Sequence, residues 1–125
     1  MSDDIICFRT DYTDDEKWNF LKKKTDEGEY ACNLVFREGD KYKNKGTDEL
    51  FKCYKPLDEE PYFFVIGDSK TMSDNIFVIA DTRTKKTFRC RVETLWEPVC
   101  NLHVGTLDIK YFEEHLVGDV YEPED

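Results

Sequence analysis

The fold of this chain is decided by two apolar runs, Tyr62-Phe63-Phe64-Val65-Ile66 and Ile76-Phe77-Val78-Ile79-Ala80. The first run ends in Gly67-Asp68 and the second ends in Asp81. Neither run alternates apolar with polar residues, which is typical of strands buried on both faces in the middle of a sheet. Because a parallel crossover usually takes about a dozen residues or more, the short Ser69–Asn75 link predicts that the two strands are antiparallel neighbours.

Shorter segments on either side predict the rest of a sheet and its helices. We expect further strands at Ile5–Phe8, Tyr30–Phe36 and Thr87–Val92, the last alternating apolar with basic residues as an edge strand does. We expect helices between these strands, at Thr13–Gly28, Thr47–Tyr54 and Ile109–Val117. The order β-α-β-α-β-β-β-α predicts an α+β fold, with a single mixed, mostly antiparallel sheet and helices packed on its faces.

The helix ends carry recognisable signals. Thr13-Asp14-Asp15-Glu16 fits a capping box in which Thr13 is the N-cap, and Gly28 ends that helix. Thr47 and Asp108 are expected to cap the two later helices. A short helical turn at Glu93–Glu97 is expected to stop at Pro98.

The composition favours one packed domain over residues 1–125. Hydrophobic residues make up 39% of the chain and aromatic residues 14%, which is enough for a core despite 37% charged residues. We expect the polar stretch Arg37–Gly46 to be a mobile loop and the acidic end, residues 119–125, to fray.

The net charge of −10, from 28 acidic and 18 basic residues, argues against nucleic-acid binding because phosphate backbones are repelled. The dense basic run, Lys22-Lys23-Lys24, is interpreted as a solvated helix face rather than a contact with nucleic acid or an anionic membrane. No apolar run approaches the roughly 20 residues of a membrane helix.

The N-terminus, Met1–Asp4, lacks the basic and apolar regions of a signal peptide. The five cysteines form no CxxC pair, and most lie in segments where cysteine is a small core residue. We therefore expect a cytoplasmic protein with reduced thiols.

Three carboxylates, Asp11, Asp68 and Asp81, follow predicted strands. If all three strands were parallel, these residues would meet at one sheet edge, where Mg²⁺ sites are common. The antiparallel link opposes this arrangement for Asp68 and Asp81, although Asp11 can still pair with one of them. Aspartate after a strand is also a routine turn or cap residue, which is the interpretation we favour.

Cysteine chemistry is the other catalytic candidate. Arg89 and Arg91 flank Cys90 and could favour a thiolate or an anion, or they could form the exposed face of an edge strand. Cys100 and His103 have a zinc-like spacing that Cys90 could join, but a structural zinc site needs four ligands and a second close pair is missing. We expect no metal and no cofactor.

Trp18 and Trp96 each lie on a short helical stretch and are expected to fill the core. If either is exposed, it becomes a candidate anchor for a binding partner, as do Arg89 and Arg91.

Several motifs of the chain resemble those of a small, mostly bacterial family of domains of unknown function. The matching segments are Arg9–Trp18, Phe64–Asp68, Val78–Asp81, Thr87–Val92 with Leu95-Trp96, and Asn101-Leu102 with Asp108–Phe112. The resemblance spans nearly the whole chain except Arg37–Gly46. Because the family has no established activity, the resemblance implies a self-contained domain and no catalytic residues. The closing segment also resembles the end of small acidic immunity proteins that neutralise toxins.

Three hypotheses for function follow. The first is a small acidic protein-binding module that acts by stoichiometric contact, as an inhibitor or immunity-type protein does, on a partner with a basic surface. The second is an enzyme that uses the strand-exit carboxylates or Cys90. The third is a structural domain that forms homo-oligomers through the edge strand Thr87–Val92.

Overall fold

The structure is a computed structural model that describes residues 5–27, 32, 34–54, 62–104 and 109–122. Its strands are β1 (Ile5–Arg9), β2 (Leu34–Arg37), β3 (Phe63–Gly67), β4 (Ile76–Asp81), β5 (Thr87–Arg91), β6 (Leu116–Val117) and β7 (Val120–Tyr121). Its helices are α1 (Asp15–Thr25), α2 (Thr47–Cys53), α3 (Ser69–Asp74), α4 (Trp96–Val104) and α5 (Ile109–Glu113), with 3-10 turns η1 (Asp40–Tyr42) and η2 (Val92–Thr94).

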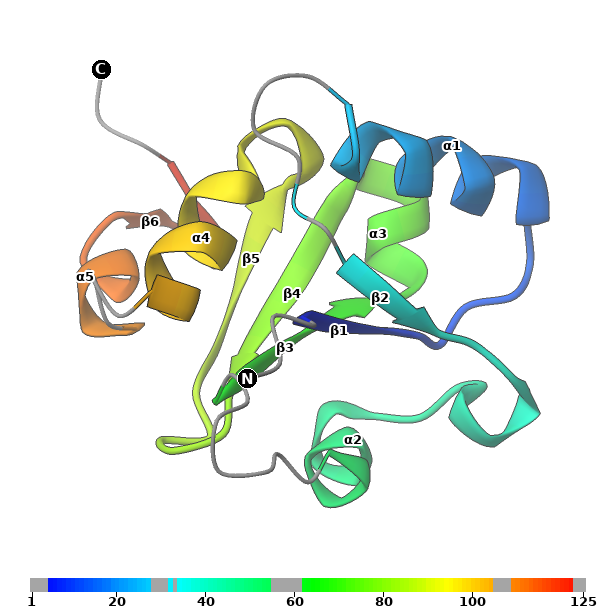
Figure 1. Cartoon of the computed structure of the whole chain (residues 1–125), viewed down its shortest axis with the longest axis horizontal. Coiled ribbons are helices and arrows are strands. Elements are labelled where there is room, and N and C mark those ends of the chain that lie inside the picture. The colour runs from blue at the N-terminus through cyan, green and yellow to red at the C-terminus, as the bar shows by residue number, and fades with distance from the viewer. Residues whose placement is uncertain (1–4, 28–31, 33, 55–61, 105–108, 123–125) are drawn as a thin grey trace.

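The strands form one seven-stranded sheet in the order β2-β1-β3-β4-β5-β7-β6 (Figure 1). The pairs β3–β4, β4–β5 and β6–β7 are antiparallel, and β1–β2, β1–β3 and β5–β7 are parallel. The predicted α+β fold with a single mixed sheet is confirmed. The antiparallel pairing of the two apolar runs is also confirmed, with Phe63 opposite Asp81 and Ile66 opposite Val78.

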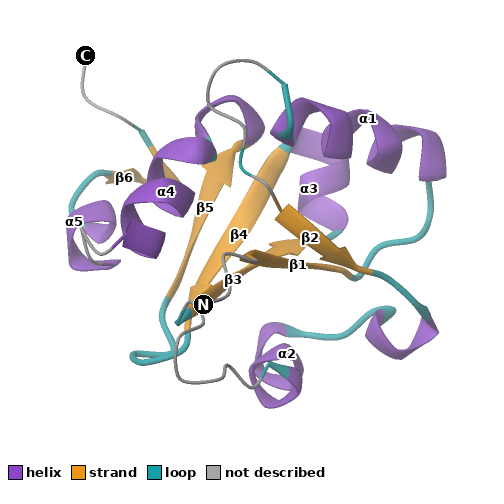
Figure 2. Cartoon of the chain, in the orientation of Figure 1, coloured by secondary structure: helices purple, strands orange, loops and turns teal. Residues whose placement is uncertain are grey.

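Both faces of the central strands are buried, as their unbroken apolar sequence predicts. Val65 and Ile79 belong to a core that includes Trp18 and Leu21 of α1 and Val99 of α4. Phe64 and Val78 belong to a second core that includes Leu50 of α2. Figure 1 shows α1 and α2 on opposite sides of β1 and β2, and Figure 2 shows the strands between these helical layers.

Helix α1 begins one residue later than its capping box predicts. The side chain of Asp14 accepts a hydrogen bond from the amide of Lys17 at 3.0 Å and is therefore the N-cap. The amide and hydroxyl of Thr13 instead both donate to Asp11 Oδ1, at 2.8 and 2.6 Å. The predicted inward residues of α1, Trp18 and Leu21, are buried.

Two further helix starts differ from the prediction. Gly46, not Thr47, is the N-cap of α2, and its carbonyl accepts from the amide of Leu50 at 3.1 Å. The link between the central strands forms α3, which Asp68 caps by accepting from the amide of Thr71 at 3.1 Å. This helix ends at Asn75, whose φ of 61° is left-handed.

Pro98 does not stop a helix, as the sequence suggested, but lies in the first turn of α4. A proline is tolerated there because the first amides of a helix have no carbonyl partner within the helix.

Strand β5 is not an edge strand, which corrects the prediction for Thr87–Val92. Its predicted alternation is confirmed, since Phe88 and Cys90 are buried. However, β7 pairs with it on the side away from β4, with Arg89 opposite Val120. An oligomer that adds a strand directly to β5 would therefore have to displace β7.

The C-terminal part of the described chain folds differently from the prediction. The last helix ends at Glu113 instead of Val117, and the chain returns as a short hairpin of β6 and β7 around Gly118, whose φ is 66°. Residues 119–121, where fraying was expected, belong to this hairpin, and Tyr121 is buried in the core.

Part of the predicted loop between β2 and α2 packs on the second core. Tyr42 of η1 is buried, and its ring centroid lies 5.1 Å from that of Phe8. The predicted helix end at Gly28, the cap at Asp108 and the start of the second strand at residues 30, 31 and 33 lie outside the described residues.

Candidate functional site

The parallel strands β1, β2 and β3 end at the same edge of the sheet. The connection from β1 to β2 carries α1, and the connection from β2 to β3 carries α2, on the opposite face. In open sheets with helices on both faces, ligands commonly bind outside the carboxyl ends of strands where successive connections leave in opposite directions. The carboxyl ends of β1 and β3 are therefore the first place to look for a site.

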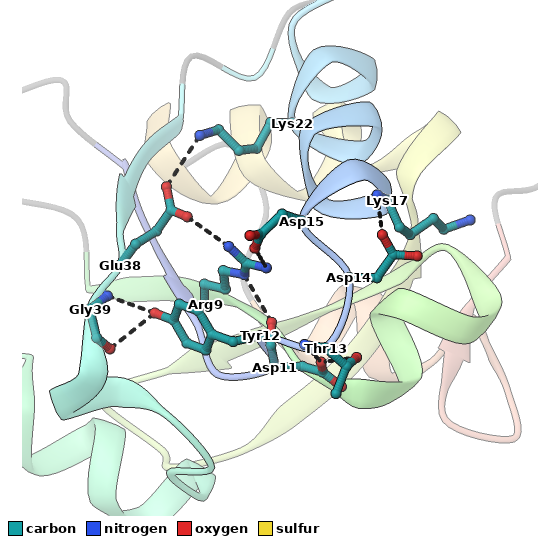
Figure 3. Close-up of polar contacts among 10 residues, drawn as sticks. All are labelled: Arg9, Asp11, Tyr12, Thr13, Asp14, Asp15, Lys17, Lys22, Glu38 and Gly39. Atoms are coloured by element: carbon teal, nitrogen blue, oxygen red, sulfur yellow. Dashed lines mark hydrogen bonds and ion pairs between the residues drawn. The ribbon is translucent and has the colours of Figure 1, made fainter.

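A buried arginine occupies this edge. Arg9, the last residue of β1, is 4% exposed, and its guanidinium donates to Asp15 Oδ1 at 2.7 Å and to Glu38 Oε1 at 3.2 Å (Figure 3). Its Nε donates to the backbone carbonyl of Asp11 at 2.8 Å. We call Arg9, Asp15 and Glu38 the Arg9 clamp, because the guanidinium joins the end of β1 to α1 and to the residue after β2.

Aromatic rings hold the guanidinium in place. It lies 4.3 Å from the ring centroid of Tyr12 and 5.2 Å from that of Trp18. The hydroxyl of Tyr12 accepts from the amide of Gly39 at 2.6 Å and lies 3.0 Å from the carbonyl of the same residue, to which it donates. Stacking of this kind and charge-assisted hydrogen bonds together stabilise a buried cation.

Glu38 is shared between two cations. Besides Arg9, it pairs with Lys22 of α1, whose Nζ lies 3.2 Å from Glu38 Oε2. Partial burial raises the pKa of Glu38, but the hydrogen bonds from Lys22 and Arg9 outweigh burial and hold the pKa below its ordinary value. Glu38 is therefore ionised at neutral pH and locks α1 to the end of β2.

The clamp fixes an acidic surface. Asp14, Asp15 and Glu16, at the start of α1, are all exposed, and we call them the acidic turn. The Asp14 carboxylate is held by the hydrogen bond that it accepts from the amide of Lys17, and the Asp15 carboxylate is held by its ion pair with Arg9 (Figure 3). These carboxylates also lie where the helix dipole favours negative charge. The turn presents negative charge to solvent, and two of its three carboxylates, those of Asp14 and Asp15, are held in place.

The three strand-exit aspartates do not converge. The register of β1 on β3 places Asp11 and Asp68 at the same edge of the sheet, but Asp81 lies at the other end of the antiparallel β3–β4 pair. Each has a local structural role: Asp11 binds Thr13, Asp68 caps α3, and Asp81 accepts from the amide and hydroxyl of Thr84 at 2.9 and 2.7 Å. The interpretation as turn and cap residues explains these contacts.

Asp68 also forms a two-pronged ion pair with Arg89. The two guanidinium nitrogens lie 3.1 and 2.8 Å from Oδ1 and Oδ2 of Asp68. Burial raises the pKa of Asp68, but the hydrogen bonds from Arg89 and from the amide of Thr71 outweigh burial and lower it. Arg89 is therefore already paired with the carboxylate of Asp68, and Arg91 is paired with that of Glu122.

Cys90 is not in an electropositive pocket. Its side chain belongs to the core on the α1 face, and its Sγ lies 3.4 Å from the hydroxyl of Thr94. Burial raises the pKa of Cys90 to about 12, so the thiol is protonated at neutral pH. The structure therefore argues against a thiolate held between Arg89 and Arg91.

The two tryptophans differ in exposure. Trp18 is 1% exposed and fills the core as expected, so it cannot anchor a partner in this conformation. Trp96 is partly buried and packs against the same core.

The described residues place no three histidine, cysteine, aspartate or glutamate side chains where they could hold a metal ion together. Cys100 is exposed, and the side chain of His103 lies outside the described residues. No helix in the described part of the chain is long and apolar enough to cross a membrane.

Sequence reasoning missed Arg9, Tyr12 and Glu38. A usable signal was present in Arg9, a lone cation that directly follows the apolar residues of β1 and precedes three nearby aspartates, Asp11, Asp14 and Asp15. Nothing local points to Glu38, because it lies 29 residues further along the chain.

A family model described as Domain of unknown function (DUF6924) matches residues 4–121, and the chain belongs to this family. A comparison with curated proteins finds no match. The match includes the Arg9 clamp, the acidic turn and every described strand.

Proposed function

We propose that this member of the family is a protein-binding module that acts by stoichiometric contact, as an inhibitor or an immunity-type protein does. The partner has a basic surface. The observation that carries the proposal is the acidic turn, in which the exposed Asp15 carboxylate is held by the buried guanidinium of Arg9 and that of Asp14 by the amide of Lys17.

Charge supports this proposal. With a net charge of −10, the chain attracts a basic partner from a distance, which raises the association rate and makes binding sensitive to salt. The acidic turn adds a local surface where the attracted partner can make a specific contact.

Rigidity supports it as well. Ordering side chains on binding costs about 0.5–1.5 kcal/mol for each flexible side chain. Asp14 and Asp15 are already ordered, the first by the amide of Lys17 and the second by Arg9, so less of this cost remains when a partner binds.

The test neutralises the acidic turn without disturbing the fold. In the double variant Asp14→Asn, Glu16→Gln, asparagine can still cap α1 and the Arg9–Asp15 pair is kept. The matched control is Asp48→Asn, Glu93→Gln, which removes the same charge from exposed positions on α2 and η2.

Partners are captured from the source cells on the immobilised wild-type chain at low salt, and a purified partner is titrated against each variant by calorimetry. We expect one-to-one binding that weakens with salt, a loss of about tenfold or more in the acidic-turn variant, and little change in the control. Affinity that is independent of salt, or that falls equally in both variants, would contradict the proposal.

A further inference from the structure

Strand β2 is the outer strand at one edge of the sheet, and β6 is the outer strand at the other. Strand β2 pairs with β1 on one side, and no other described strand pairs with it. An outer strand presents backbone N–H and C=O groups that another strand can bind, and many proteins protect such edges with charges, prolines or bulges. Three of the four residues of β2, Leu34, Val35 and Phe36, are apolar and half-buried, so the charge of Arg37 at the end of the strand is the only one of these protections.

A groove runs beside this edge, between β2 and α1. It has a volume of about 440 Å³ and is lined by Leu34 and Phe36 of β2 together with residues of α1. Leu34 and Phe36 are the partners of Ile5 and Cys7 in the sheet register, so they lie on the α1 face. The groove therefore has an apolar side next to a strand whose outer edge is open among the described residues.

Charge changes sign along the groove. Lys22 lies near the end of β2, because its Nζ is 3.2 Å from Glu38 and 5.3 Å from the ring centroid of Phe36. The other end of α1 lies near the start of β2, because the amide of Cys32 donates to the carbonyl of Thr25 at 2.9 Å. Lys22 and Lys23 consequently line the part of the groove toward the end of β2, and Asp26 and Glu27 line the part toward its start.

We propose that β2 binds an extended peptide segment of a partner protein as an additional strand. Side chains of a strand alternate between faces, so an apolar residue of the peptide occupies the groove against Leu34 and Phe36 while its backbone pairs with β2. A carboxylate of the peptide lies beside Lys23, which lines the groove and is exposed.

A segment of a partner fits this edge better than a second copy of the chain. Two copies would each bring a net charge of −10 to a contact centred on a strand of four residues. A short peptide with one carboxylate meets little of that repulsion and can pair with Lys23. This surface is separate from the acidic turn, and the inference does not depend on the function proposed above.

The test uses two fluorescent seven-residue peptides of alternating valine and threonine, with one glutamate at either the N-terminal or the C-terminal end. Because the groove is cationic at one end only, we expect saturable one-to-one binding in which one of the two peptides binds more tightly. A copy of that peptide that is N-methylated on alternate residues should lose binding, since it cannot pair along its backbone.

Protein variants test the charged end of the groove. Lys23→Glu should weaken binding of the tighter peptide about fivefold or more, since an attractive contact becomes repulsive. Lys110→Glu, an equal charge change at an exposed site on α5, should have little effect. Equal binding of the N-methylated peptide, equal effects of the two variants, or no binding at millimolar peptide would overturn the proposal. So would a concentration-dependent dimer in sedimentation that Lys23→Glu disrupts, because a second copy would then occupy the edge.

Discussion

The indole of Trp18 lies directly against Gly67, the last residue of β3. A Cβ at Gly67 would be 2.7 Å from Cη2 of Trp18 and closer still to Cζ3. Lack of space therefore excludes a larger residue at position 67. Backbone conformation is not the reason, because Gly67 is not among the described glycines with a positive φ. The contact fixes α1 over the junction of β1 and β3, where the Arg9 clamp is built.

Gly67→Ala should therefore lower the free energy of unfolding by about 1–3 kcal/mol, because the buried indole cannot move away from an added methyl without disturbing the core. Urea denaturation followed by tryptophan fluorescence measures the change. Gly46→Ala is the control, since a Cβ there meets nothing within 4 Å. Its cost should stay below about 1 kcal/mol, for the weaker helix cap. Equal costs at the two positions would show that Trp18 does not restrict Gly67.

Arg9→Met should lower the free energy of unfolding by about 2–3 kcal/mol, because the change removes the cation shared by Asp15 and Glu38. The loss is limited because the Asp15 side chain is 78% exposed and stays hydrated. Methionine keeps much of the buried apolar stem of arginine, so the measurement reports mainly the charge and its hydrogen bonds.

Arg83→Met is the matched control for Arg9. Arg83 also stacks on an aromatic ring, at 4.2 Å from the centroid of Tyr62, but it is exposed. Its replacement should cost less than about 1 kcal/mol. If thermal and urea unfolding give the same small change for both variants, the clamp does not stabilise the fold.

The central strands could be predicted because burial on both faces leaves a signal at every residue of β3 and β4. Shorter elements leave no such signal. Strand β7 is two residues long, Val120–Tyr121, so no period can be measured, and the sequence therefore placed β5 at an edge. Helix α3 has only six residues. The sequence pattern that marks its start, Asp68 followed by Thr71 three residues later, is also found in simple turns.

The candidate site was harder to predict than the sheet. Strand-exit aspartates attract attention as possible ligands, but Asp11 binds Thr13, two residues away, and Asp68 binds Thr71, three residues away, and pairs with Arg89 of β5. Arg9 instead depends on Glu38, which follows a different strand, and only the register of β1 on β2 brings the two together. Local sequence patterns do not contain that register.

The Asp68–Arg89 pair should make stability depend on pH. Because the pKa of Asp68 is lower in the folded chain than in the unfolded chain, ionised Asp68 stabilises the fold at neutral pH. This contribution is present above the unfolded pKa of about 4 and is lost as the pH falls through the folded pKa. Asp68→Asn should be less stable than wild type by about 1–3 kcal/mol at pH 7, and the difference should shrink toward pH 2.

Urea denaturation at several pH values measures this difference, and asparagine retains the cap of α3. Asp119→Asn is the control, because the Asp119 side chain lies 3.5 Å from the same guanidinium but is 62% exposed. It should change the pH dependence little. A gap between wild type and Asp68→Asn that stays constant down to pH 2 would show that the charge of Asp68 does not stabilise the fold.

Cysteine labelling should separate the buried thiols from the exposed ones and test Cys90 as a nucleophile. In the folded chain at pH 8, iodoacetamide should modify the exposed Cys53 and Cys100, while Cys7, Cys32 and Cys90 react only after unfolding. Burial raises the pKa of Cys32 and of Cys90 to about 12, so neither thiol supplies the thiolate that attacks the reagent and displaces iodide. Mass spectrometry of peptides over time identifies each site, and Cys53→Ser should remove one rapid adduct. Rapid modification of Cys90 in the folded chain would instead reveal a reactive thiolate beside Arg89 and Arg91 and revive the enzyme hypothesis.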